Sequence, residues 1–305
     1  MTTNGHAALA ARNLTVRYGK LTAIEGIDFD VAPGSVYALL GRNGAGKSSL
    51  IRCLLGFQKP DQGQALVFGR EVWRERASLM KRVAFVPEEP DAPPEMTAAE
   101  IVRFCGRLYE GWNDREAMEN LNRLHIPLKV QYGKLSKGQK RQVALAIALV
   151  VRPEILILDD PTLGLDVVAR KQLFEELISD LADRGTTVFV TTHDLPGLEG
   201  IADRVGILRN GRMVLDEDLE QLKWRFRRIR YATPAAAATT AELEQLETVE
   251  VRRWAAGIEA VVANYSDTSL ERFRASSGIR DLQVTPMSLE EIFIAISSDE
   301  QGAAS

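Results

Sequence analysis

The chain has 305 residues, 45% of them hydrophobic and 26% charged, and it carries a formal net charge of −4 at pH 7. Its length predicts two domains with a core of ordinary size, and its negative charge argues against a surface that attracts nucleic acid as a whole. Its two cysteines, Cys53 and Cys105, are too few and too far apart for a disulfide framework or a metal site, so we expect buried free thiols.

The N-terminal residues lack the cationic and apolar regions of a secretion signal. The longest apolar run, residues 143–151, is about half as long as a bilayer span. The sequence therefore predicts a cytoplasmic protein that reaches a membrane only through a partner.

The first half of the chain begins with strand-like alternation over residues 9–40. A glycine-rich loop follows the last of these strands, and a helical pattern occupies residues 47–57. Further strand-like runs lie at 63–69 and 82–90. From about residue 89 to residue 151 the apolar residues recur at helical spacing, which predicts a helical insertion.

Strands return in the second half, at residues 155–159, 186–192 and 204–211. A helix is predicted between the first two, over residues 169–185, with Gly185 at its C-terminal end. Because wholly apolar strands alternate with helices, we expect a parallel sheet that is buried on both faces.

The chain changes in composition after Asp218. The expected division is a disordered N-terminus, a large domain, a linker, a small α+β domain and a disordered tail, at residues 1–8, 9–218, 219–240, 241–298 and 299–305. If residues 227–231 form its first strand, the small domain has the element order of a ferredoxin-like fold. The basic segment 223–230 is either a linker helix or a contact for anionic lipid head groups.

The segment GRNGAGKS, residues 41–48, satisfies the P-loop pattern between a predicted strand and a predicted helix. Glycines allow backbone N–H groups to surround a β-phosphate, and the helix N-terminus favours anions. Lys47 supplies a charge for the β- and γ-phosphates, and Ser48 a hydroxyl for Mg²⁺. The predicted ATP contacts here are Gly41, Asn43, Gly44, Ala45, Gly46, Lys47, Ser48 and Ser49.

Asp159 ends the apolar strand ILILD, where a carboxylate can hold Mg²⁺ directly or through water. A P-loop followed by such an acid predicts a P-loop nucleoside triphosphate hydrolase that binds Mg²⁺. These two motifs do not define a narrower class.

The segment LSKGQKRQ, residues 135–142, resembles the LSGGQ signature of the ATP-binding cassette (ABC) family. Tyr18 lies where this family places an aromatic ring on adenine, and Glu88 lies in a segment that resembles the Q-loop. LGLD, residues 163–166, resembles the D-loop, and His193 stands where the family has its switch histidine. Six motifs occur in the family's order over residues 9–215.

The resemblance implies an α/β fold: a P-loop NTPase (RecA-like) ABC nucleotide-binding domain with a helical subdomain at about 89–151 and an N-terminal antiparallel β subdomain. It also implies that a signature completes the ATP site of a second copy, so a symmetric homodimer is expected. The signature contacts made in trans would come from Ser136, Lys137, Gly138 and Gln139. The dimer interface would include Leu163, Gly164, Leu165 and Asp166.

Three residues depart from the family pattern. Lys137 replaces a glycine, and it either adds charge near the phosphates or is merely solvated. Glu88 replaces the usual glutamine and lacks its amide N–H₂, although its carboxylate can still contact Mg²⁺ or its water. A glutamate there is typical of drug and antibiotic exporters in the family.

The third departure is Asp160, which stands where the family usually has a glutamate that orients or polarises the attacking water. Aspartate is one methylene shorter, and a misplacement of roughly 1 Å can lower a rate about 10²-fold. Two interpretations stay open: the backbone or a water compensates and turnover is ordinary, or hydrolysis is slow and the ATP-bound dimer is long-lived. The expected catalytic residues are therefore Asp160, His193, Glu88 and Lys47, with Ser48, Asp159 and Glu88 at Mg²⁺.

The resemblance implies the ATP-hydrolysing subunit of a transporter, with export as the expected direction. A separate membrane permease would dock near Glu88–Pro94 and the helices that follow, on the cytoplasmic face of the membrane. The alternative is a soluble ABC ATPase that acts on nucleic acid or ribosomes. It is disfavoured by the negative net charge, by the single cassette and by the lack of sustained heptads, so no nucleic acid is expected as a partner.

Overall fold

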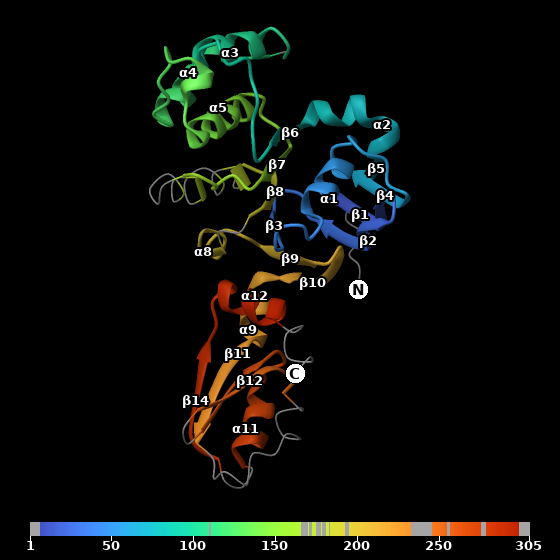
Figure 1. Ribbon diagram of the computed structural model, residues 1–305, viewed down its shortest axis with the longest axis vertical. Helices are drawn as coiled ribbons and strands as arrows, with labels where there is room; N and C mark the ends of the chain where they lie inside the picture. The colour runs from blue at the N-terminus through green and yellow to red at the C-terminus, as the bar shows by residue number, and fades with distance from the viewer. Residues whose placement is uncertain are drawn as a thin grey trace. The chain divides into compact units, whose positions relative to one another are not determined.

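The computed structural model describes residues 7–109, 111–165, 170, 173–174, 178, 181–182, 184–192, 195–232, 246–254, 257–275 and 279–298. The chain forms two compact units, Met1–Asp216 and Glu217–Ser305. Figure 1 shows the elements of each unit. None of the helices within the described ranges is both long and apolar enough to cross a membrane.

Unit 1 contains an antiparallel sheet with the strand order β2-β1-β4-β5. Its strands are β1 (Leu9–Tyr18), β2 (Leu21–Val31), β4 (Gln62–Val67) and β5 (Arg70–Glu71). The second sheet of unit 1 has the order β10-β9-β3-β8-β7-β6. Its strands are β3 (Val36–Leu40), β6 (Val83–Val86), β7 (Ile155–Asp159), β8 (Thr187–Thr191), β9 (Arg204–Arg209) and β10 (Arg212–Asp218).

The central strands of the second sheet are parallel, and every residue of β3, β7 and β8 is buried. This confirms the prediction of a parallel sheet covered on both faces. One apolar core joins it to the antiparallel sheet and to helix α1 (Lys47–Leu54). Within that core the Tyr37 and Phe189 rings stack with centroids 5.5 Å apart, and Phe29 of β2 lies 5.4 Å from Tyr37.

The helical insertion consists of α3 (Ala98–Gly106), α4 (Asp114–Arg123) and α5 (Lys137–Val150), which pack around a separate apolar core. Each helix begins at a side-chain cap, supplied by Thr97, Asn113 and Ser136. Such caps satisfy N–H groups that the first turn of a helix leaves without partners. Helix α2 (Val72–Leu79) and short 3-10 turns at Met80–Arg82 and Tyr132–Lys134 were not predicted. A short helix, α8 (Leu195–Leu198), lies between β8 and β9.

Unit 2 begins with helix α9 (Leu219–Arg225) and strand β11 (Arg227–Ala232), so these parts of the predicted linker are regular structure. The unit continues with β12 (Thr248–Trp254), β13 (Gly257–Val262), α11 (Asp267–Ala275), β14 (Arg280–Pro286) and α12 (Leu289–Ser298). Its sheet is antiparallel with the order β12-β13-β11-β14. The sequence of these elements agrees with the predicted ferredoxin-like order, and the predicted first helix falls outside the described residues.

Candidate functional site

The P-loop connects the carboxyl end of β3 to the start of α1. Gly44 and Gly46 adopt positive φ angles of 81° and 111°, a region that side chains other than glycine rarely occupy. A Cβ atom on Gly46 would lie 2.6 Å from the carbonyl oxygen of Ala23 and from Ile24 Cγ2. The loop can therefore fold against the antiparallel sheet only with glycine at this position.

The turn between β9 and β10 connects the P-loop to the antiparallel sheet by hydrogen bonds. The Gly211 amide donates a hydrogen bond to the Ala45 carbonyl at 3.1 Å, and the Gly211 carbonyl accepts one from the Glu25 amide at 2.8 Å. Asn210 and Gly211 both have positive φ. Sequence analysis missed these two residues, although an Asn-Gly pair between two strands is a recognisable signal for a two-residue hairpin turn.

A cavity of about 660 Å³ opens at the carboxyl end of the parallel strands. It brings together most of the residues that the sequence predicted for the ATP site. Those that line the cavity are Tyr18, Asn43, Gly44, Ala45, Gly46, Lys47, Ser48, Ser49, Glu88, Asp159 and Asp160. Leu21, Thr22, Ala23, Asn210 and Gly211 also line it and were not predicted. Gly41 does not line the cavity, but its carbonyl accepts a hydrogen bond from Lys47 Nζ at 2.6 Å.

Lys47 is a partly buried cation in the lining of this cavity. Burial lowers the pKa of its ammonium group, and the nearby carboxylates of Asp160, Asp159 and Glu88 oppose that shift. Its Nζ also lies 3.4 Å from the Arg42 carbonyl. The ammonium group is thus held by carbonyl oxygens of its own loop, which phosphate oxygens can replace.

Asp159 and Asp160 follow one another at the end of β7. Asp159 is buried and accepts a hydrogen bond from the Thr191 hydroxyl at 2.5 Å. Burial raises the pKa of Asp159, the Thr191 hydrogen bond opposes the rise, and the neighbouring charge of Asp160 adds to it. The Asp159 carboxylate is therefore poorly solvated and is well suited to a cation.

Asp160 turns the chain at the end of the strand with a φ of 48°, in the left-handed region. Its amide donates to the Thr191 carbonyl at 2.8 Å, and Thr192 Oγ1 donates to its carboxylate at 3.4 Å. Aspartate tolerates left-handed backbone better than most residues with a Cβ atom. The short acid therefore suits this turn, and its carboxylate lies in the same cavity as Lys47.

Tyr18 ends β1 at the rim of the cavity, and it is 42% exposed. Its hydroxyl donates a hydrogen bond to Gln58 and lies 3.4 Å from Ser49 Oγ. The ring is thereby fixed at its polar end while part of its surface remains accessible. This arrangement suits stacking on a planar base.

The signature residues begin α5 and do not line the cavity among the residues that the structure describes. Ser136 and Gln139 form a capping box, in which each side chain bonds the backbone amide of the other. Gly138 is buried, and a Cβ atom on it would lie 2.9 Å from the Gly164 carbonyl. The predicted signature and the predicted D-loop are therefore in direct contact, with Leu165 buried beside them and Leu163 partly exposed.

Two basic side chains connect the signature helix to the loop that carries Glu88. Lys137 Nζ lies 3.1 Å from Glu89 Oε1, and both side chains are largely exposed, so this pair stabilises the fold by less than about 1 kcal/mol. Arg141 is only 3% exposed, and its Nε donates to the Glu88 carbonyl at 2.6 Å. Its buried Nη1 has no hydrogen-bond partner within the described part of the chain. Sequence analysis did not predict a role for Arg141.

Two predicted site residues, Asp166 and His193, lie outside the described residues. The remaining geometry combines a glycine-dependent phosphate loop, a partly buried cation, a pair of strand-end acids and a capped helix N-terminus. Together these features define a P-loop ATPase cassette.

Comparison with known proteins narrows this class. A protein-family model for ABC transporters matches residues 24–163. The SkfA peptide export ATP-binding protein SkfE of Bacillus subtilis is 37% identical over 226 residues, which cover 71% of this chain and 93% of that protein. The Nod factor export ATP-binding protein I of Rhizobium etli is 32% identical over 306 residues, which cover 96% of this chain and 94% of that protein. The bacitracin transport ATP-binding protein BcrA of Bacillus licheniformis is 34% identical, and the match covers 71% of each chain.

Solved structures agree with this match. An ATP-binding subunit of an ABC transporter has a TM-score of 0.64 and 28% identity, and the match covers 72% of this chain and 92% of that chain. A dimeric bacterial ABC transporter cassette has a TM-score of 0.63 and 25% identity, with 69% and 98% coverage. The chain belongs to the ABC transporter family, and its enzymatic activity is ATP hydrolysis coupled to transport.

The raised pKa of Asp159 gives a prediction for Asp159→Asn. Because the native state binds a proton at this site more readily than the unfolded state does, the ionised carboxylate destabilises the nucleotide-free fold above the ordinary aspartate pKa. Asparagine removes that charge and keeps an acceptor for Thr191. We expect the variant to lose Mg²⁺-dependent hydrolysis and to melt higher at neutral pH, by about 2–4 °C for each 1 kcal/mol gained.

Thermal unfolding of the nucleotide-free protein at several pH values measures this effect. The advantage of Asp159→Asn should shrink as the pH falls through the raised pKa of the wild-type carboxylate, because the wild-type group is then neutral too. An equal or lower Tm for the variant at neutral pH would contradict the proposed penalty.

The contacts of Arg141 give a second prediction. Arg141→Met keeps a long apolar stem but leaves the Glu88 carbonyl without its donor, so the loop that carries Glu88 is held less firmly. Because Arg141 does not line the nucleotide cavity, we expect kcat for ATP to fall several-fold while KM changes little. Steady-state ATPase kinetics measure both constants.

The matched control is Arg103→Met, an exposed arginine on α3 whose Nε donates to the Ala99 carbonyl of its own helix. It should leave both constants close to wild type. A rise in KM of Arg141→Met with an unchanged kcat would show that Arg141 acts on nucleotide binding and not on the position of Glu88.

Proposed function

We propose that this chain is the ATP-hydrolysing subunit of an ABC exporter, which works as a homodimer that encloses ATP and drives a separate permease. One observation carries the dimer: the capped signature helix lies outside the cavity that the P-loop residues line. The N-terminus of this helix suits phosphate binding, yet it does not line the cavity of its own chain. In a two-fold symmetric dimer, each copy would supply its signature helix to the cavity of the other copy.

The cavity supports a defined role for each residue. Tyr18 stacks on the adenine, the P-loop amides and Lys47 bind the phosphates, and Asp160 orients the attacking water. Ser48, Asp159 and Glu88 offer oxygen ligands of the type that Mg²⁺ prefers, and the poorly solvated Asp159 fits a cation. Mg²⁺ bound there would neutralise charge on the phosphate oxygens. His193 is proposed as the γ-phosphate sensor from its sequence position alone.

The relatives support a direction of transport and a location for the chain. Two of the proteins described above are named for export and one for bacitracin transport, which supports export and a place on the cytoplasmic face of a membrane. None of these names supports the alternative, an ATPase that acts on nucleic acid or ribosomes.

The proposed permease dock is the loop from Glu88 to Pro94 together with the end of α3. The helical subdomain holds this loop, because the Tyr132 hydroxyl donates to the Pro90 carbonyl at 2.7 Å and the Gly133 amide to the Pro94 carbonyl at 2.9 Å. Beyond it, three large apolar side chains are exposed: Phe104, Leu108 and Tyr109. Exposed apolar side chains that follow such a loop in the chain suit a protein partner.

We propose in addition that hydrolysis is slow. The Asp160 amide donates to the Thr191 carbonyl, which fixes the backbone, and Thr192 Oγ1 donates to the Asp160 carboxylate, so the shorter side chain is not free to advance. Asp160→Glu lengthens the acid by one methylene, and we expect kcat to rise several-fold, with a lower Tm because glutamate tolerates left-handed backbone less well. ATPase assays and thermal unfolding test the two effects.

Asp160→Asn is the matched control, because it keeps the length of the side chain and removes the base. It should bind ATP, lose nearly all turnover and accumulate as an ATP-dependent dimer in size-exclusion chromatography with light scattering. If Asp160→Glu turns over no faster than wild type, the idea that a retracted acid limits the rate is wrong.

The transporter assignment predicts what co-purifies with the tagged chain from detergent-solubilised membranes. We expect a stable complex with a protein that has several membrane spans. Leu108→Asp should weaken that complex and leave the basal ATPase rate unchanged, because Leu108 is 67% exposed and lies outside the nucleotide cavity.

Val214→Asp, at another exposed apolar position of unit 1, is the control and should retain the complex. Recovery with ribosomes or DNA instead of a membrane protein would overturn the transporter assignment.

A further inference from the structure

The segment from Ile51 to Arg82 is basic although the chain as a whole is acidic. It contains seven basic and three acidic residues, whereas the formal net charge of the chain is −4. It runs from the second half of α1 through β4, β5 and α2 to the 3-10 turn at Met80–Arg82. Its positive charge is therefore a local feature of unit 1, of the kind that attracts an anionic partner.

The three acidic side chains of this segment are already engaged. Two of them form ion pairs within the segment, Glu71 with Arg74 and Glu75 with Arg70. The third, Asp61, accepts a hydrogen bond from a backbone amide of β1 at 2.7 Å. Four cations of the segment are exposed and form no ion pair with the residues that the structure describes: Arg52, Lys59, Arg76 and Lys81. An anion at the surface can therefore reach these cations without displacing a carboxylate.

Two exposed aromatic side chains accompany these cations where α2 packs on the end of α1 (Figure 1). Phe57 follows α1 and is 59% exposed. The Arg76 guanidinium lies 4.7 Å from the centre of the Phe57 ring, and its Nε donates to a carbonyl at the end of α1 at 3.0 Å. Trp73 is 45% exposed and follows Val72, whose Cγ1 would lie 3.0 Å from a Cβ atom on Gly56. The α1–α2 surface consists of these two rings and of Arg52, Lys59 and Arg76.

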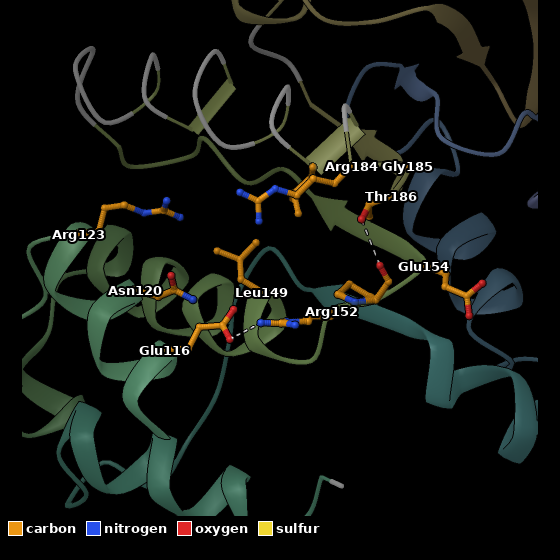
Figure 2. Close-up of a pocket in the computed structure, with 11 residues that line it drawn as sticks. Glu116, Asn120, Arg123, Leu149, Arg152, Glu154, Arg184, Gly185 and Thr186 are labelled. Atoms are coloured by element: carbon orange, nitrogen blue, oxygen red, sulfur yellow. Dashed lines mark hydrogen bonds and ion pairs between the residues drawn. The ribbon is translucent and has the colours of Figure 1, made fainter. Parts of the chain in front are cut away.

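Other basic parts of the chain are balanced by carboxylates to a greater extent. In the cavity that Figure 2 shows, Arg152 pairs with Glu116 at 2.9 Å. In the basic segment 223–230, Arg227 lies 5.2 Å from the centre of the Trp224 ring. The other three arginines of that segment form ion pairs: Arg225 with Glu217, Arg228 with Glu291, and Arg230 with Glu259. The α1–α2 surface therefore keeps more of its charge for a partner than segment 223–230 does.

We propose that the α1–α2 surface binds the anionic head groups of a lipid bilayer directly. Basic side chains are attracted to an anionic leaflet, and exposed aromatic rings are favoured at the boundary between head groups and acyl chains. The surface offers both kinds of side chain, and Phe57 and Trp73 give it an apolar component that a purely electrostatic contact does not need. This contact goes beyond the permease dock at Glu88–Pro94, because it needs no protein partner.

Co-sedimentation of the full-length protein with sucrose-loaded vesicles tests this surface. We expect saturable binding to vesicles of phosphatidylcholine and phosphatidylglycerol, little binding to phosphatidylcholine alone, and weaker binding as the salt concentration rises. The double variant Arg52→Gln/Lys59→Gln should weaken the affinity about 10-fold or more, since each cation at an anionic surface contributes about fivefold. Trp73→Ser should weaken it several-fold, because it removes a ring that favours the interface. These side chains are exposed and do not line the nucleotide cavity, so the basal ATPase rate should stay unchanged.

Arg227→Gln and Trp224→Ser are the matched controls, because they remove an arginine and a 60% exposed ring from segment 223–230. Both should bind vesicles as the wild type does. Equal binding to neutral and anionic vesicles, no binding to either, or an unchanged affinity in Arg52→Gln/Lys59→Gln would overturn the proposal. If Trp73→Ser lowers the Tm, the double variant decides the result.

A protein partner for the same surface gives a different outcome. If the wild type does not bind vesicles, and Arg52→Gln/Lys59→Gln instead loses the co-purifying membrane protein, the surface binds a protein and the lipid proposal is wrong. Because the vesicles contain no protein, a failure of vesicle binding does not affect the transporter assignment, which depends on co-purification.

Discussion

The site depends on keeping a cation and a carboxylate partly dehydrated at one edge of a parallel sheet. Burial shifts the pKa of Lys47 downward and that of Asp159 upward, so each charged form is less favourable than it would be in water. Phosphate oxygens bound to Lys47 and Mg²⁺ bound to Asp159 would replace the favourable interactions with water that burial removes. The nucleotide-free protein therefore gives up some stability here in exchange for affinity toward a charged ligand.

The surrounding fold explains how these groups stay in place. The rings of Tyr37 and Phe189 stack between neighbouring parallel strands, and Phe29 joins them from the antiparallel sheet. This aromatic contact, together with α1, packs the two sheets of unit 1 into one core. The P-loop is held at the same junction, because Gly46 approaches Ala23 of the antiparallel sheet too closely for any side chain. The rigidity of the phosphate loop is thus a property of the packed sheets and not of the loop alone.

Much of this arrangement could be predicted from the sequence because it is encoded locally. The order of strand, glycine loop and helix around Lys47 and the acids after an apolar strand both lie within short segments. The Asn210–Gly211 turn was also a local signal, but nothing nearby in the sequence connects it to a P-loop about 165 residues earlier, and only the hydrogen bond to Ala45 does so. Helix α2 was missed because its pattern is weak and its backbone is distorted at Glu75.

Arg141 shows most clearly what sequence patterns cannot reveal. In the sequence it is one of several basic residues after the signature, and a charged residue on a helix is expected to face water. In the structure it is buried, because the Glu88 carbonyl 53 positions earlier accepts its hydrogen bond. That one contact connects the loop that carries Glu88 to helix α5. The loop is proposed to bind the permease, and the N-terminus of α5 is proposed to bind the ATP of a second copy. If both proposals hold, a force on the loop reaches the signature through a buried guanidinium, and such a connection is stiff because breaking it would leave a buried charge without a partner.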